Sequence, residues 1–207
     1  MTHIPYSARI LVLLGVLGLV AGIDLRRNRD RAQKWREYLF LLFAAAVGGL
    51  FGVGTDSVTV RISPEYFEIG KEIPAGDGFL GRVLALGFQA GFFAGAVIGM
   101  ALLIANNPRP GRPPLPYARL RRLVPIPLMA ALLTAAPASL LFARDPFGLA
   151  GALTGFVSPD RVPAFLTVWG AHTGLYLGAM IGTLVAVRRI RRERTSAVGG
   201  AFRPRPG

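Results

Sequence analysis

Five apolar stretches separated by polar segments dominate the sequence. A helix needs ~20 apolar residues to cross the ~30 Å hydrocarbon core of a bilayer, and most of the stretches approach or exceed this length. The predicted crossings lie at about residues 8–23, 38–53, 80–105, 123–143 and 165–187. This arrangement places two longer loops, at residues 54–79 and 144–164, on the same side of the membrane. The pattern therefore predicts an all-α membrane protein with one polytopic domain, residues 1–195, and a disordered basic tail at 196–207.

Composition supports the membrane assignment and narrows the chemistry. Hydrophobic residues make up 52% of the 207 positions, charged residues only 17%, and the mean hydropathy is +0.47, which is too apolar for an ordinary soluble domain. The absence of cysteine excludes disulfides, thiolate metal ligands and thiol nucleophiles. With His3 and His172 as the only histidines, we expect no metal site and no cofactor. Neither a serine–lysine nor a paired-aspartate catalytic pattern is present.

The distribution of charge predicts the orientation. With loops assigned alternately, 18 of the 24 basic residues and four of the 11 acidic ones fall on one side, giving +14 there and −1 on the other. Basic loops stay in the cytoplasm, so we expect the N-terminus outside and the C-terminus inside. Six basic residues in 24–37 argue against a cleaved signal peptide and favour the cytoplasmic (inner) membrane. The arginines indicate contact with anionic lipid headgroups rather than nucleic acid, because the basic segments are short or proline-rich.

The first outer loop predicts two local structures. Val58, Val60 and Ile62 alternate with polar residues, which is typical of a short extended strand on the membrane surface. The run 63–65, Ser-Pro-Glu, then has the cap, proline and acid of a helix start. Tyr66 and Phe67 are expected at headgroup level.

Two features of the outer segments leave alternatives open. The acids of the first loop could bind an ion or act in acid–base chemistry, or could be solvated loop acids; they are Asp56, Glu65, Glu68 and Glu72. In the second loop, residues 147–157 are uncharged and too short to span. This run predicts either an interfacial helix or a re-entrant segment.

The run from Asp56 to Phe67, which contains Ser63, Pro64, Glu65 and Tyr66, resembles a family of uncharacterised bacterial multi-pass membrane proteins with an extracytoplasmic Ser-Pro-Glu-Tyr-Phe segment. The likeness extends over roughly residues 40–190. It includes paired aromatics with spaced glycines at 92–99, and the last apolar stretch through His172, Tyr176 and Gly178. The chain departs from the family pattern at Glu68. The resemblance implies a bacterial inner-membrane topology and assigns no activity.

Two glycine ladders indicate close helix packing and an internal repeat. Glycines recur at every fourth position in two of the stretches, and a shift of 83 residues superposes them: Gly87, Gly91, Gly95 and Gly99 on Gly170, Gly174, Gly178 and Gly182. Small residues at this spacing let helix backbones approach in lipid, as in GxxxG motifs. Crossings 2–3 and 4–5 are thereby predicted to form two hairpins in a parallel repeat, with the first crossing added.

His172 is the main candidate for a polar intramembrane site, together with Gln89 at the matching position of the other ladder and Tyr176 one turn away. At 100° per residue His172 lies about 140° from its glycine ladder, so its helix should be covered on two sides or line a cavity. If the two ladders pack on each other, Gln89 and His172 point apart. If the two polar residues meet, the ladders must pack elsewhere.

The role of His172 stays open between three interpretations, one of them a metal or haem ligand. A structural role would be an interhelical hydrogen bond, with Tyr176 or a hydroxyl such as Thr134 or Ser139. A functional role would be proton- or ligand-linked. The sequence favours a non-enzymatic accessory, scaffold or ligand-binding membrane component, alone or within a homo-oligomer or membrane complex. The alternative is a small transporter or channel. An enzyme would require an outer acid such as Asp56 or Glu65 to converge with His172 in one cleft.

Overall fold

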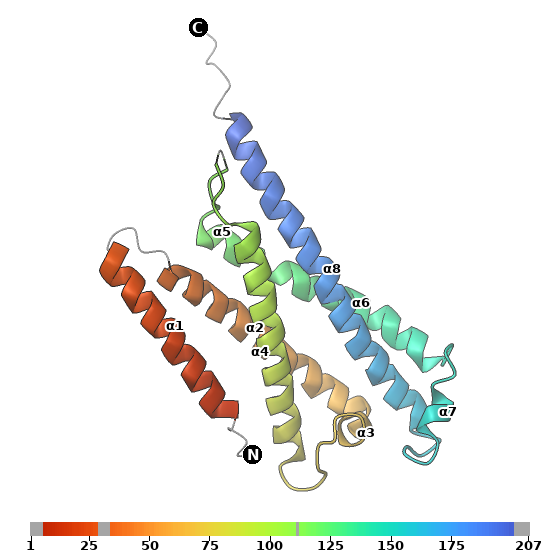
Figure 1. Cartoon of the computed structure of the whole chain (residues 1–207). Helices are drawn as coiled ribbons and strands as arrows, with labels where there is room; N and C mark the ends of the chain where they lie inside the picture. The colour runs from red at the N-terminus through yellow and green to blue at the C-terminus, as the bar shows by residue number, and fades with distance from the viewer. Residues whose placement is uncertain (1–5, 29–33, 111, 201–207) are drawn as a thin grey trace.

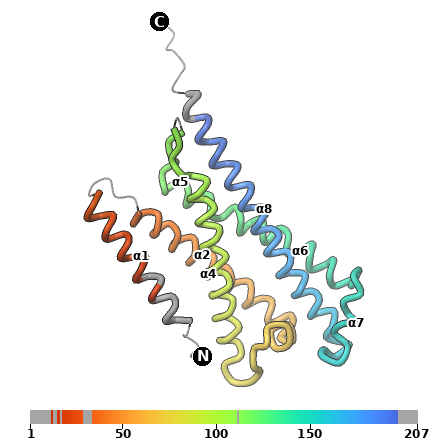
Figure 2. Tube along the Cα trace, viewed as in Figure 1, coloured from red at the N-terminus to blue at the C-terminus, as the bar shows by residue number. Residues whose placement is uncertain are grey.

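The computed structural model describes residues 6–28, 34–110 and 112–200, and every named element in this part of the chain is a helix (Figure 1). The helices are α1 (Tyr6–Asn28), α2 (Lys34–Ile62), α3 (Pro64–Glu68), α4 (Phe79–Ala105), α5 (Tyr117–Arg121), α6 (Pro125–Ala143), α7 (Ala150–Leu153) and α8 (Val162–Gly200). The short helices α3 and α7 lie near one end of the bundle, and α5 lies near the other, where α8 continues toward the C-terminus (Figure 1, with the same view as a tube in Figure 2). We refer to these as the α3 end and the α5 end.

Within the described residues, four segments are long and apolar enough to cross a membrane, which confirms the membrane character predicted from the sequence. They are Lys34–Ile62, Phe79–Ala105, Tyr117–Ala143 and Val162–Ser196. Large apolar side chains cover their outer faces, including Phe93 and Leu133, each more than 70% exposed. Such a surface suits lipid rather than water. The first predicted crossing forms α1, a helix of 23 residues beside α2, and its crossing, like the orientation, stays a prediction.

The predicted strand at Val58, Val60 and Ile62 is wrong, because α2 continues without a break to Ile62. Polar side chains of this last part are satisfied by the helix itself: the Thr59 hydroxyl donates to the Thr55 carbonyl oxygen at 3.0 Å. Because the backbone N–H and C=O groups of this segment pair within the helix, the segment has no need of a partner strand. The first outer loop therefore begins at Ser63 and not at residue 54.

Three other boundaries can be compared with the prediction. The helix start at Ser63 is confirmed, since α3 has Ser63 at its N-cap and Pro64 at its first position. Residues 147–157 contain only the four-residue helix α7, so no helix of the predicted length forms there. At the other end α8 extends to Gly200, into the predicted tail, whose remaining residues 201–207 lie outside the described part.

Two antiparallel hairpins, α2–α4 and α6–α8, form the bundle (Figure 1). In the first, a Cβ added at Gly87, Gly91 or Gly95 would overlap a backbone carbonyl oxygen of α2, each one turn from the last. In the second, Gly170, Gly174 and Gly178 meet carbonyl oxygens of α6 in the same way. Each ladder therefore packs inside its own hairpin. Neither of the two arrangements expected for the ladders occurs, and the repeat stays a prediction.

The two hairpins are joined by an apolar cluster at each end. At the α3 end Phe67, Val83 and Phe165 belong to one buried cluster that joins the first hairpin and α3 to α8. At the α5 end Leu102 and Ile190 belong to a second cluster that joins α2 and α4 to α5, α6 and α8. The middle of the bundle lies between these clusters.

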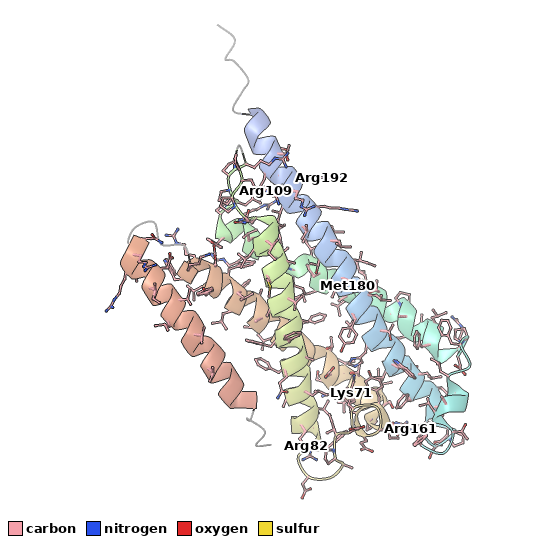
Figure 3. All side chains as sticks on the ribbon, viewed as in Figure 1. Lys71, Arg82, Arg109, Arg161, Met180 and Arg192 are labelled. Atoms are coloured by element: carbon pink, nitrogen blue, oxygen red, sulfur yellow. The ribbon has the colours of Figure 1, made fainter. Side chains whose placement is uncertain are left out.

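A polar tie reinforces the apolar cluster at the α5 end. The guanidinium of Arg194, only 4% exposed, donates to the carbonyl oxygens of Ala105 at 2.7 Å, Asn107 at 2.8 Å, Arg112 at 2.6 Å and Pro113 at 3.1 Å. It thus binds α8 to the end of α4 and to the following loop. Arg194 is therefore not one of the lipid-facing arginines that its place in the sequence predicted. By contrast, Arg109 and Arg192 extend from the same end in Figure 3.

Gly91→Ala should destabilise the protein by about 1–3 kcal/mol, because the new Cβ overlaps the Gly48 carbonyl oxygen and the helices must separate. Gly54→Ala is the matched control in α2, since nothing lies within 4 Å of a Cβ added there. It should leave stability unchanged or raise it by up to about 1 kcal/mol. Unfolding in mild detergent measures both, and equal stability of the two variants would contradict the close contact.

Candidate functional site

A cavity of about 140 Å³ lies between the two hairpins. Most of its wall consists of glycines, alanines and larger aliphatic residues from α2, α4, α6 and α8. Its polar groups are Thr55, Asp56, Lys71, His172 and Tyr176. Gln89 is half-buried and does not line the cavity, so two of the three residues of the predicted polar site meet here and the third does not.

Asp56 is the central residue of this site, and its position differs from the predicted one. The sequence predicts it in an outer loop, but it lies in α2 and is 5% exposed. Its carboxylate sits over Gly87 of α4, where a Cβ would come within 2.6 Å of Oδ2. The absence of a side chain at Gly87 therefore gives the carboxylate its space between the helices. Its Oδ1 lies 3.6 Å from Nε2 of His172.

His172 faces the first hairpin, as its predicted distance from the glycine ladder requires. Its Nε2 lies 3.4 Å from the hydroxyl oxygen of Thr59, one turn after Asp56. That hydroxyl donates to the carbonyl oxygen of Thr55, and an ionised carboxylate is only an acceptor. A protonated Nε2 therefore suits both neighbours, and we assign that tautomer.

The hydroxyls predicted as partners of His172 bond elsewhere. Thr134 donates to the carbonyl oxygen of Gly174 at 2.6 Å, and Ser139 donates to that of Ala135 at 2.9 Å. The first of these bonds strengthens the α6–α8 hairpin and does not touch the site. A periodic signal for the true partners was present in the sequence, because residues at i and i+3, here Asp56 and Thr59, share a face once the segment is read as a helix.

Two aromatic side chains of α3 cover the imidazole. Tyr66 stacks on His172 with ring centroids 4.9 Å apart, and Phe67 meets it edge-on at 5.9 Å. Both are buried, at 6% and 0% exposure, so they face the interior of the bundle, and their headgroup level stays a prediction. Burial raises the pKa of the Tyr66 hydroxyl far above its ordinary value, with smaller contributions from Tyr176 and Asp56. Tyr66 is therefore a neutral phenol that closes one wall of the site.

The other acids of the predicted motif do not converge with Asp56. Glu65 accepts hydrogen bonds from Arg161 at 2.7 Å and from the Ser63 hydroxyl at 2.8 Å, and this pair ties α3 to the start of α8. Glu68 is half-buried and Glu72 is exposed in the loop that follows. Of these acids, Asp56 faces the cavity, whereas Glu65 holds the two hairpins together through Arg161.

Lys71 is the cation at the rim of the cavity. It is exposed, its Nζ lies 5.5 Å from the ring centroid of Tyr66, and it lines the same cavity as Asp56. In Figure 3 it lies near the α3 end of the bundle, toward Arg161. One carboxylate and one ammonium group therefore face a mainly apolar space, and their formal charges offset each other.

The ion pair between Glu65 and Arg161 should make the free energy of unfolding depend on pH. Burial raises the pKa of Glu65, but hydrogen bonds from Arg161, its own backbone and Ser63 outweigh this and hold the pKa below its ordinary value. A lowered pKa contributes stability that is complete above the unfolded-state pKa and is lost as pH falls through the folded-state pKa.

We therefore expect Glu65→Gln to unfold at a lower temperature than the wild type at pH 7, and the difference to close below about pH 4. Thermal unfolding in detergent across this range provides the measurement. Glu72→Gln, at an exposed acid of the same segment, should keep the wild-type acid response. The prediction fails if Glu65→Gln shows the same acid response as the wild type.

No family model, curated protein or solved structure matches the chain. The resemblance of residues 56–67 to uncharacterised bacterial membrane proteins stays a prediction. The geometry around Asp56 and His172, with their apolar cavity, is thus the basis for a functional hypothesis.

Proposed function

We propose that the protein is a non-enzymatic, ligand-binding component of a membrane, and that it holds a small amphipathic molecule between its two hairpins. One observation carries this proposal: an apolar cavity has its charged and hydrogen-bonding groups gathered around Asp56 and His172. Binding sites for small molecules commonly have this form, with apolar walls and a few convergent polar groups that fix orientation.

The size of the cavity limits the ligand. Its volume of about 140 Å³ is close to that of a cavity of about 150 Å³ that holds a benzene ring. The fitting part of the ligand is therefore one ring or a short branched chain. A longer chain would have to continue outward, past the half-exposed Tyr176.

The polar groups define the head of the ligand. Asp56 accepts hydrogen bonds, Lys71 donates them, and the Tyr176 hydroxyl does both. Since the charges of Asp56 and Lys71 offset each other, a head without net charge fits best. An alcohol, a phenol or an amide carries the required donor and acceptor.

Catalysis is a weaker hypothesis, although Asp56 does converge with His172 as an enzyme would require. The imidazole Nε2 faces Asp56 and Thr59 of the protein, and Tyr66 stacks on the ring. The nearest hydroxyl, that of Thr59, donates to a backbone carbonyl and is not held as a nucleophile. These contacts favour His172 as a fixed wall of a binding site.

Transport is the second candidate, and the two separate closures of the cavity favour it. Apolar clusters join the hairpins on either side of the cavity, and the pair Glu65–Arg161 reinforces the closure at the α3 end. Rocking of two repeats around a central site is how many transporters alternate access. Asp56 and His172 would then form the central polar site, without Gln89.

Filling the cavity should abolish ligand binding. Ala94 lines the cavity on α4, whereas Val97 on the same helix is 48% exposed and does not line it. We expect native mass spectrometry of the wild type, purified in mild detergent, to show a bound small molecule. The molecule should be absent from Ala94→Phe and retained by Val97→Phe.

Ala90→Phe fills the same cavity from another position and guards against misfolding of the first variant. Unfolding temperatures of all variants establish that they are folded. Retention of the molecule by both folded filling variants, or its absence from the wild type, would reject the binding site.

Cysteine labelling separates binding from transport, because the chain contains no cysteine. Ala94→Cys places a single thiol in the cavity, and a membrane-impermeant maleimide can be applied to either face of oriented vesicles. For the binding component we expect labelling from one face at most. Asp77→Cys, in the exposed loop before α4, is the control for one-sided labelling. Labelling of Ala94→Cys from both faces would establish alternating access and favour the transporter.

A further inference from the structure

A second concave surface lies at the α5 end, outside the cavity. It is a groove of about 350 Å³ between the start of α2 and α5, lined by Trp35, Arg36, Leu39, Phe40, Phe43, Tyr117 and Arg121. We call it the α2–α5 groove. The rings of Phe40 and Tyr117, with centroids 6.3 Å apart, join its two walls.

The groove has a basic part formed by both walls. Arg36 comes from α2 and Arg121 from α5, and none of the described acidic residues lines the groove. The nearby acid Glu37 is bound to Lys34 at 2.9 Å. The guanidinium of Arg36 lies 5.1 Å from the Trp35 ring centroid, so part of its position is fixed without an acidic partner. Two guanidinium groups without a lining carboxylate suit a phosphate.

The rest of the groove is apolar and follows α2 toward the middle of the membrane. Leu39 and Phe43 lie three and seven residues after Arg36, on the same face of the helix. At ~1.5 Å per residue the path from Arg36 to Phe43 is about 10 Å long. Leu39 is 56% exposed and Phe43 is 38% exposed, which leaves an apolar surface open beside the arginines.

The position along the helix matches the boundary of a bilayer. Arg36 lies three positions into the segment Lys34–Ile62, one of the four able to span a membrane. Trp35 and Tyr117 are residue types enriched at membrane interfaces. The groove therefore presents cations at the polar boundary and an apolar path below them, in the order of a phospholipid headgroup and its acyl chain.

We infer that the α2–α5 groove is a binding site for one anionic phospholipid. Its phosphate lies between Arg36 and Arg121, and an acyl chain follows Leu39 and Phe43. Binding of this kind is distinct from general attraction of the arginine-rich end to a charged surface, because two arginines and one apolar path define it. It is independent of the cavity ligand, which lies between the hairpins.

Native mass spectrometry of the full chain in mild detergent tests the site, with dioleoyl phosphatidylglycerol or dioleoyl phosphatidylcholine as the added probe. The wild type should bind the anionic lipid more tightly. Arg36→Ala/Arg121→Ala should weaken its binding roughly 30-fold, about fivefold for each arginine near the headgroup. Its affinity should then approach that for the zwitterionic lipid.

Arg122→Ala/Arg192→Ala is the matched control, because it removes two exposed arginines of the same end that do not line the groove. It should keep the wild-type preference. Leu39→Asn places an amide in the acyl path and should weaken the binding of both lipids. Three results would overturn the inference: no preference in the wild type, full preference in Arg36→Ala/Arg121→Ala, or an equal loss in the control.

Discussion

The close approach of helix backbones inside each hairpin is the contact on which the rest of the structure depends. At Gly91 and Gly174 a carbonyl oxygen of the neighbouring helix occupies the place that a side chain would need. Lipid offers no hydrophobic force between apolar helices, so packing of this kind must hold each hairpin together. Because the glycine ladders are used within the hairpins, other faces of the helices are left to meet the other hairpin. His172 lies on such a face, and Gly87 gives Asp56 its space.

The sequence allowed the larger part of this architecture to be predicted. Length and hydropathy identify the four long spans, and the spacing of glycines identifies the packing faces. Helical geometry then places His172 away from its ladder, against a second surface. The ladder pattern did not reveal which helices pair, since two similar ladders can pack on each other or on their chain neighbours. In the structure the ladder of α4 packs on α2 and the ladder of α8 packs on α6. The carbonyl oxygens of α2 and α6 lie one turn apart, opposite the glycines.

The partners of His172 were missed because local signals near Asp56 favour a loop and a strand over the helix that brings Asp56 and Thr59 to one face. A charge at residue 56 and alternating β-branched residues ended the predicted span at residue 53. In the structure the helix continues, since Thr59 bonds to its own backbone and Asp56 meets a glycine and an imidazole. A charge that looks incompatible with a membrane helix is therefore the acid of the site.

At the α5 end, the number of arginines likewise does not predict the role of each one. The loop after α4 contains five prolines between residues 108 and 116, and proline has no N–H to offer neighbouring carbonyl oxygens. The guanidinium of Arg194 supplies donors to four carbonyls of this region. Charge alone does not distinguish the buried Arg194 from Arg192, which lies two residues earlier and is exposed. The difference lies in the carbonyl oxygens opposite Arg194, which accept hydrogen bonds from its guanidinium.

The length of α2 explains how a helix that crosses a bilayer can carry a charged site. Its 29 residues extend about 43 Å at ~1.5 Å per residue, more than the ~30 Å hydrocarbon core. Asp56 lies six residues, or about 9 Å, from the end of the helix. The polar end of the cavity can thus lie near a membrane boundary, while Gly91, Ala94 and Ile98 extend its apolar wall toward the centre. An amphipathic ligand bound there has the same orientation as the lipids around it, so it can enter from the bilayer without turning over.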